Sequence, residues 1–488
     1  MKKIVVVSRP SDWPLRIPGI EVVSGRDYLV DPEWAGVRNL RAYNLCRSYR
    51  YQCEGYYVSL LASARGHRPF PGLMTVLDMK SRAIVRTADE ELEQLAARSL
   101  SHLKGDRFEL SVYFGRNTAQ RHERLARKLF NLFPAPLLRA SFARSDRWRL
   151  TSVTPIGFRD VPESHHAFVQ EAATAYFTRP HARDVKRRQG RYDLAILADP
   201  DEELAPSDAK ALARFRAAGE KVGFNVEMIR REDYGRISEF DALFLRETTY
   251  VNHHTFRFAQ RAEAEGLVVI DDPTSILRCT NKVFLAEAFE RAGVPMPKTW
   301  ITDHVTAEEV ERRIGFPCVL KLPDSSFSQG VVKCADAASL EREAAQILDE
   351  SDLLIVQEYT PSDFDWRVGL FRGEVLYVCR YHMSGGHWQI VQKTKTGRYR
   401  YGKVEPVPLD EVPKSVIRFA KLAAGTIGDG LYGVDLKQVG RRVLVMEVND
   451  NPNLDAGCED ALLKDELYLK IMGGLLTSVE QGKQRSVR

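Results

Sequence analysis

The side chains with the clearest chemical potential lie near the end of the chain, in residues 431–453, LYGVDLKQVGRRVLVMEVNDNPN. Two runs rich in valine and leucine flank a short polar turn, which predicts a β-hairpin with a three-residue loop at 440–442. That register places Asp435 opposite Glu447, and strand alternation places Asn449 on the same face as Glu447. Facing carboxylates repel unless a cation joins them, and carboxylate and amide oxygens suit Mg²⁺ bound together with phosphates. The spacing predicts a metal site here, with an ordinary solvated hairpin face as the alternative.

Isolated cations and a polar loop lie upstream. Lys321 interrupts an apolar stretch, VLKLP, that predicts a buried strand, where a lysine is costly unless it meets an anion. Lys282 is a second isolated cation, inside a predicted helix at 274–293. The segment 325–330, SSFSQG, offers hydroxyl groups, backbone N–H groups and a permissive glycine, and such a loop can fold over phosphates as a flap. The candidate residues of this flap are Ser325, Ser326, Ser328, Gln329 and Gly330.

Further polar residues follow on predicted strands. Residues 357–358 end an apolar strand, where backbone groups could pair with the edge of a purine. Asp365 and Arg367 share one face of the next strand. A two-residue turn at 372–373 would place Arg380 opposite Asp365. Two arginines and a carboxylate on one sheet face could receive a ribose hydroxyl and an anionic substrate, although exposed Arg–Asp pairs are often merely solvated.

The composition bounds the class of protein. A chain of 488 residues is long enough for roughly three domains, and 44% hydrophobic and 28% charged residues are ordinary for a protein with an ample core. The net charge of +5 and the lack of a repeated basic and aromatic pattern argue against a nucleic-acid platform. Seven cysteines without compact spacing predict reduced thiols and a cytoplasmic protein. No apolar run approaches the ~18 residues of a membrane span, so no membrane partner is expected.

Three units follow one another along the chain. Residues 1–165 mix strands and helices, with an aromatic-rich helix expected within 37–66. A basic segment at 179–191 resembles a linker. Residues 191–273 alternate strands with helices, which predicts a parallel sheet of about four strands, without a GxGxxG turn. Residues 274–480 run helix, antiparallel strands, helix and hairpin, an α+β pattern. The predicted fold class is α/β and α+β multidomain, and no internal repeat is visible.

Tyrosine and arginine residues gather in the first unit. This cluster comprises Tyr43, Arg47, Tyr49, Arg50, Tyr51, Tyr56 and Tyr57. It could form a ligand surface, but a stripe of this kind is more often core packing with the arginines reaching out to water. The sequence leaves both interpretations open.

In the order in which these motifs occur, residues 275–475 resemble an ATP-grasp domain of the branch that includes RimK-type glutamate ligases and glutathione synthetases. The matching pieces are Asn281-Lys282, VLKLP, SSFSQG, VQEY, DWR, GVDL and MEVNDNPN. Residues 191–273 resemble the α/β domain that precedes ATP-grasp domains, and residues 1–165 resemble an N-terminal domain found fused to some RimK-like ligases. One departure is the segment DNPNL at 450–454, where many relatives carry a small-residue turn such as SPG, so Asn453 can contact substrate differently.

The resemblance implies a role for each matching residue. ATP would be bound by Lys282, Lys321, the flap residues, the hinge Gln357, Glu358 and Tyr359, and Asp365. Mg²⁺, with Mn²⁺ as a variant, would be bound by Asp435, Glu447 and Asn449. The carboxylate substrate would face Arg367 and Arg380, which with Lys321 form the expected catalytic set.

The implied activity is ATP-dependent ligation of a carboxylate to an amine through an acyl phosphate. The acceptor could be an amino acid, a peptide or a protein tail, and the sequence names neither substrate. A phosphotransferase and a non-catalytic ATP-binding regulator are the alternatives, and a homo-oligomer is left open.

Overall fold

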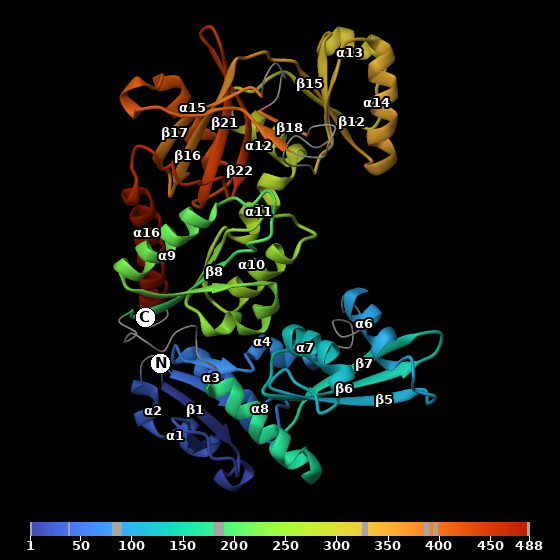
Figure 1. Ribbon diagram of the computed structural model, residues 1–488, viewed down its shortest axis with the longest axis vertical. Helices are drawn as coiled ribbons and strands as arrows, with labels where there is room; N and C mark the ends of the chain where they lie inside the picture. Colours follow the sequence, from blue (N-terminus) through green and yellow to red (C-terminus); the bar gives the residue numbers. More distant parts are fainter. Residues whose placement is uncertain are drawn as a thin grey trace.

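The computed structural model describes residues 2–37, 40–80, 90–178, 190–324, 330–384, 390–393 and 399–485. Figure 1 shows an elongated molecule in which the N-terminal part lies at one end, the central part follows, and the C-terminal part lies at the other end. Among the described residues, no helix combines the length and apolar character needed to cross a membrane. The predicted linker at 179–191 falls mostly outside the described ranges.

A parallel sheet opens the chain. Its strands are Lys2–Val7 (β1), Glu21–Ser24 (β2), Leu40–Asn44 (β3) and Arg68–Phe70 (β4), in the order β2-β1-β3-β4. Its helices are Gly25–Val30 (α1), Pro32–Gly36 (α2), Glu54–Ala64 (α3) and Leu73–Lys80 (α4). The helix expected within 37–66 is therefore wrong over most of its length, because β3 is buried on both faces inside this sheet and the helix begins only at Glu54.

An antiparallel sheet completes the N-terminal part. Its strands are Arg107–Tyr113 (β5), Leu137–Arg144 (β6) and Trp148–Pro155 (β7), in the order β5-β6-β7. The accompanying helices are Glu90–Leu100 (α6), Glu123–Leu132 (α7) and His166–Thr178 (α8). One face of the parallel sheet, with Val5, Tyr43 and Phe70, packs into the same core as these helices and strands. The N-terminal part therefore has a shared core across both sheets.

The central part is the predicted parallel sheet. Its strands are Tyr192–Leu197 (β8), Phe224–Ile229 (β9), Ala242–Leu245 (β10) and Val268–Ile270 (β11), in the order β11-β10-β8-β9. Its helices are Ala209–Val222 (α9), Arg231–Glu239 (η5, a 3₁₀ helix), His254–Ala264 (α10) and Pro273–Thr280 (α11). The prediction of a four-stranded parallel sheet is confirmed.

The two parallel sheets repeat one arrangement. In each, the first strand lies between the second and the third, and the fourth lies beside the third. Helix α3 (54–64), strand β4 (68–70) and helix α4 (73–80) recur 200 residues later as α10 (254–264), β11 (268–270) and α11 (273–280). Gly66 and Gly266, at the matching helix-to-strand turns, both have positive φ, 68° and 78°. The expectation of no internal repeat is thus wrong at the level of structure.

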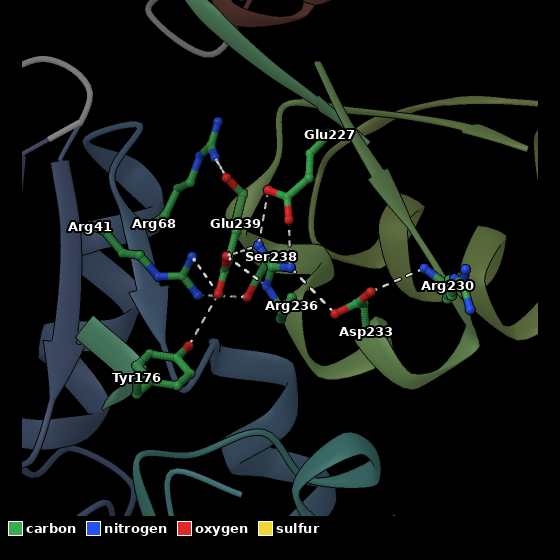
Figure 2. Close-up of polar contacts among 9 residues, drawn as sticks. All are labelled: Arg41, Arg68, Tyr176, Glu227, Arg230, Asp233, Arg236, Ser238 and Glu239. Atoms are coloured by element: carbon green, nitrogen blue, oxygen red, sulfur yellow. Dashed lines mark hydrogen bonds and ion pairs between the residues drawn. The ribbon is translucent and has the colours of Figure 1, made fainter. Parts of the chain in front are cut away.

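Arginine residues join the two copies (Figure 2). Arg41, near the start of β3, lies 3.7 Å from the carboxylate of Glu239 and donates to Ser238 at 3.3 Å. Arg68, the first residue of β4, donates to the Glu239 carbonyl and pairs with Asp241, which precedes β10. Since these arginines lie toward the amino ends of β3 and β4, the carboxyl end of β3 lies on the side away from this junction.

The C-terminal part contains two antiparallel sheets. The smaller has Thr299–Thr302 (β12), Cys318–Lys321 (β13), Val331–Cys334 (β14) and Leu354–Glu358 (β15), in the order β12-β15-β13-β14, with helices Ala307–Arg313 (α13) and Ala337–Glu350 (α14). The larger has Phe364–Phe371 (β16), Glu374–His382 (β17), Val404–Pro406 (β20), Leu431–Val439 (β21) and Arg442–Asp450 (β22), in the order β20-β17-β16-β21-β22. A two-stranded ribbon pairs Val391–Lys393 (β18) with Tyr399–Tyr401 (β19). The remaining helices are Lys282–Ala292 (α12), Lys414–Gly425 (α15) and Asp465–Arg485 (α16), and α16 packs beside α9 of the central part (Figure 1).

The helix predicted at 274–293 is two helices. It is interrupted at Asn281, whose side chain accepts the backbone N–H of Phe284 at 2.9 Å. This is the N-cap interaction that starts a new helix. Lys282 is therefore the first residue of α12 and not an interior residue, which is a correction to its predicted position.

Candidate active site

The predicted metal-binding hairpin is formed by β21 and β22. Asp435 lies opposite Glu447 and Gly433 opposite Asn449, as predicted. The predicted three-residue loop is wrong, because Val439 pairs with Arg442 across a two-residue turn. A β-bulge at Met446 supplies the missing residue and restores the facing of the carboxylates.

The carboxylate of Asp435 is held by hydrogen bonds. Arg367, directly opposite on β16, donates from Nε and Nη2 to the two oxygens of Asp435 at 2.6 Å each. Asn449 donates to the same carboxylate at 3.1 Å. Burial raises the pKa of Asp435 to about 6, against the opposing charge of Arg367. Arg367, Asp435 and Glu447 form one row across three strands of the sheet.

Glu447 lies in a field of cations. Burial acts to raise the pKa of Glu447, but Lys282, Lys321 and Arg367 together hold that pKa below its usual value. No group of three His, Cys, Asp or Glu residues that could hold a metal occurs in the part of the chain the structure describes. Two carboxylates and one amide oxygen fit a Mg²⁺ ion that completes its shell with water and phosphate oxygens.

Both predicted lysines border one pocket. Burial lowers the pKa of Lys321 to about 8 and also lowers that of Lys282, while the charge of Glu447 opposes both shifts. The lining residues are Lys282, Leu285, Ala286, Phe289, Met296, Thr299, Lys321, Ile355, Gln357, Val445 and Met446. A mainly apolar pocket with two cations at its border suits a flat base attached to phosphates.

The predicted hinge is brought to the pocket only in part. Gln357 lines the pocket and donates to Thr299 at 2.9 Å. The carboxylate of Glu358 instead binds Arg442, the first residue of β22, at 3.0 and 3.1 Å. The ammonium of Lys333 lies over the ring of Tyr359, 3.7 Å from the ring centroid. The flap residues 325–329 lie outside the described ranges, and Gly330, with φ of 65°, is the first described residue after them.

The predicted position of Arg380 is wrong. The two-residue turn at 372–373 is present, but a bulge after it in β17 shifts the register by one residue. Asp365 therefore faces Tyr381, and Arg380 faces Trp366 on the other side of the sheet. The guanidinium of Arg380 stacks 4.9 Å from the Trp366 ring and pairs with Glu405 at 3.5 Å.

Sequence reasoning missed Lys437. Its ammonium lies 2.6 Å from Asp365 and 2.8 Å from the Ser362 hydroxyl. Lys437 follows Asp435 by two positions on the same strand, so alternation could have placed it on this face. The predicted ribose-binding carboxylate, Asp365, is therefore paired with a lysine of β21.

Two residues of the central part, Arg246 and Asp271, hold the chain that follows the predicted metal ligands, and sequence reasoning missed both. Arg246, fully buried at the end of β10, donates to Asn451 Oδ1 at 2.7 Å, to the Pro452 carbonyl at 2.9 Å, to Ser207 at 3.0 Å and to the Pro206 carbonyl. Asp271, at the end of β11, accepts the backbone N–H groups of Leu431 at 3.2 Å and Asn451 at 2.5 Å.

We call Arg246 and Asp271 the latch. Residue 451 follows Asn449 by two positions, so the latch fixes the chain directly beyond the predicted metal ligands. Gly433 leaves room for this path, because a Cβ there would lie 2.8 Å from Pro452. The sequence signal was a charged residue at the end of each of two apolar strands, but nothing in the sequence indicated their partners.

Comparison with known families agrees with this geometry. Residues 25–172 match the family described as RimK-like ATPgrasp N-terminal domain, and residues 279–465 match the RimK-like ATP-grasp domain. The chain is therefore an ATP-grasp protein. It belongs to the RimK-like ATP-grasp proteins that carry this N-terminal domain, and the family predicted from the motifs is confirmed.

Similar proteins cover about half of the chain. An alpha-aminoadipate–LysW ligase, LysX, of Saccharolobus solfataricus is 27% identical over 254 residues, 48% of this chain and 86% of that protein. A probable alpha-L-glutamate ligase of Vibrio vulnificus is 24% identical over 271 residues, 52% of this chain and 87% of that protein. Among solved structures, D-cycloserine synthetase DcsG aligns with a TM-score of 0.46 at 17% identity, covering 59% of this chain and 99% of that one.

Proposed function

We propose that this protein is an ATP-dependent carboxylate–amine ligase. The observation that carries the proposal is the arrangement of opposite charges around Glu447, which faces Asp435 and lies within the field of Lys282 and Lys321 at the border of the pocket. That arrangement suits a nucleotide whose base enters the pocket and whose phosphates reach the hairpin.

The chain's own residues would position and stabilise charge. Lys282 and Lys321 would neutralise phosphate oxygens, and Asp435, Glu447 and Asn449 would hold Mg²⁺ or Mn²⁺, which supplies further neutralisation when bound. A substrate carboxylate attacks the γ-phosphorus of ATP, the bond to the bridging oxygen breaks, and ADP leaves. An amine then attacks the acyl carbon, phosphate leaves, and the amine loses a proton.

Arg367 has two roles in this proposal, one toward Asp435 and one toward the substrate. Its Nε and one terminal nitrogen fix the metal ligand Asp435, and its guanidinium lies 4.7 Å from the ring of Tyr381. A guanidinium oriented in this way could direct its remaining donors to an anionic substrate. Arg380, on the other side of the sheet, is not part of this proposed set.

The substrate class follows from the names of the relatives. LysX is named for joining alpha-aminoadipate to LysW, and the second relative is named for glutamate. We propose that one substrate is an amino acid and that the other is an amino acid, a peptide or a protein tail. Consumption of ATP and the free state of all described cysteines favour a cytoplasmic location.

The test is a screen of ADP release with pairs of amino acids, followed by mass spectrometry of the products. If the protein is a ligase, ADP release needs both a carboxylate and an amine. The mass of the product then equals the summed masses of the two substrates less one water. A stable phosphorylated product formed without an amine would instead identify a phosphotransferase. Absence of ADP release with every pair, despite measurable ATP binding, would favour the regulator.

A further inference from the structure

The duplicated sheets offer two carboxyl edges, and the edge of the second copy contacts the ATP-grasp part. In open parallel sheets, ligands bind outside the carboxyl ends of the strands, where the strand order reverses. In the first copy this point lies between β1 and β3. The loop that leaves β3 there, residues 45–53, lies at the end of the strand away from Arg41 and the junction with the second copy.

The second copy shows what this edge can hold. Its corresponding loop, residues 246–253, contacts a polypeptide segment of the ATP-grasp part. Arg246 binds the side chain of Asn451 and the carbonyl of Pro452, and Thr249 donates to the carboxylate of Asp450 at 2.6 Å. This edge of the fold thus receives an irregular polypeptide segment that carries a carboxylate, through an arginine and a hydroxyl group.

In the structure, the tyrosines of the predicted tyrosine and arginine cluster form a buried set and an exposed set. Tyr43 and Tyr49 are buried, as expected for core packing. Tyr51 is 69% exposed and Tyr57 37% exposed, and the rings of Tyr51, Tyr56 and Tyr57 contact one another edge to face at 5.2 and 5.5 Å. We call this exposed face, with the arginines of the same loop, the Tyr–Arg surface.

The charge of the Tyr–Arg surface is positive. Arg47 and Arg159 share a single buried carboxylate, Asp12, at 2.6 and 2.9 Å. Arg50 is exposed and has no ion pair among the residues that the structure describes. The nearest acid on the helix, Glu54, accepts from the Ser8 hydroxyl. Arg47 and Arg50, in the same loop as Tyr51, together with the tyrosine rings in edge-to-face contact, offer groups suited to carboxylates and to the peptide backbone.

We propose that the Tyr–Arg surface binds an acidic polypeptide segment of a partner protein. The duplicated edge already receives such a segment in the second copy, and the charge of the surface complements carboxylates. The low net charge of the whole chain, +5, disfavours a nucleic acid as the occupant. The proposal concerns binding alone and is independent of the ligase assignment.

The test uses the full chain and a fluorescein-labelled decapeptide of alternating aspartate and glycine, followed by fluorescence anisotropy at low salt. We expect Arg50→Glu and Tyr51→Ala each to raise the Kd by about tenfold, the loss typical of one central contact residue. Both side chains are exposed, so the thermal midpoint should remain at the wild-type value. Arg98→Glu, an exposed arginine on α6, is the matched control and should change the Kd less than about twofold.

Three results would overturn the proposal. One is the absence of peptide binding by the wild-type chain. Another is an equal loss of affinity in Arg98→Glu, which would show a general effect of net charge. The last is tighter binding of a single-stranded oligonucleotide of equal length than of the peptide, which would make the surface a nucleic-acid site.

Discussion

The latch gives the most quantitative prediction, through Arg246→Met. Methionine approximates the length of arginine but donates no hydrogen bond, so four acceptors lose their donor: Ser207, the Pro206 and Pro452 carbonyls, and Asn451 Oδ1. Four hydrogen bonds to a charged group contribute about 6–12 kcal/mol at about 1.5–3 kcal/mol each.

Burial offsets part of this contribution. It lowers the pKa of Arg246 to about 10, and at about 1.4 kcal/mol per pH unit the charged form is disfavoured by about 3 kcal/mol. The remainder is about 3–9 kcal/mol, and its lower part coincides with the usual cost of about 3–5 kcal/mol for removing one partner from a buried charged network.

The assay for Arg246→Met has two parts. For a loss of about 3–5 kcal/mol, the thermal midpoint should fall by about 6–20 °C, at about 2–4 °C per kcal/mol. ADP formation should also need more Mg²⁺ for half-maximal rate, because the chain beyond Asn449 loses its support. Arg216→Met, which removes an exposed pair with Glu220 on α9, is the control and should change stability by less than about 1 kcal/mol. An Arg246→Met variant with the wild-type midpoint and Mg²⁺ dependence would refute the latch.

Four further predictions concern the site itself. Lys321→Met should keep the fold and raise the Kd for ATP, and calorimetric titration showing wild-type affinity would remove Lys321 from the site. Because the lowered pKa of Lys321 is about 8, its ammonium is lost as pH rises through that value, so ATP affinity should fall between about pH 7 and 9 in the wild type but not in Lys321→Met. Glu447→Gln should abolish turnover with an unchanged circular dichroism spectrum, and wild-type activity at limiting Mg²⁺ would contradict the metal site. Arg380→Ala should leave kcat within about threefold of wild type while Arg367→Ala lowers it by about 100-fold, and equal losses would return Arg380 to the site.

The residues that could be placed from sequence were those fixed by local rules. Strand alternation places Glu447 and Asn449 on one face, and a cation within an apolar strand marks Lys321. The facing of Asp435 and Glu447 was predicted correctly only because the bulge at Met446 compensates for the wrong turn length. Arg380 was misplaced because a bulge leaves no reliable mark in the sequence, and one extra residue moves every later side chain to the other face.

The longer-range features could not be predicted. Arg246 and Asn451 meet across 205 residues, and no local pattern joins them. The duplication is not visible in the sequence because α3 and α10 have few identical residues. Each helix has a buried face, on which Ala62 corresponds to Ala262. The strand at 40–44, LRAYN, is missed because it is buried on both faces and lacks the alternation that identifies a strand.

The bulge at Met446 has a consequence for how this hairpin can change in evolution. A three-residue turn without a bulge and a two-residue turn with one give the same facing of Asp435 and Glu447. A two-residue turn without any bulge gives the same facing with one residue fewer between the two carboxylates. Deletion of Met446 would therefore remove the bulge and leave Asp435 opposite Glu447. Direct pairing across the hairpin keeps the two carboxylates on one face, so this interval tolerates a change of one residue in its length.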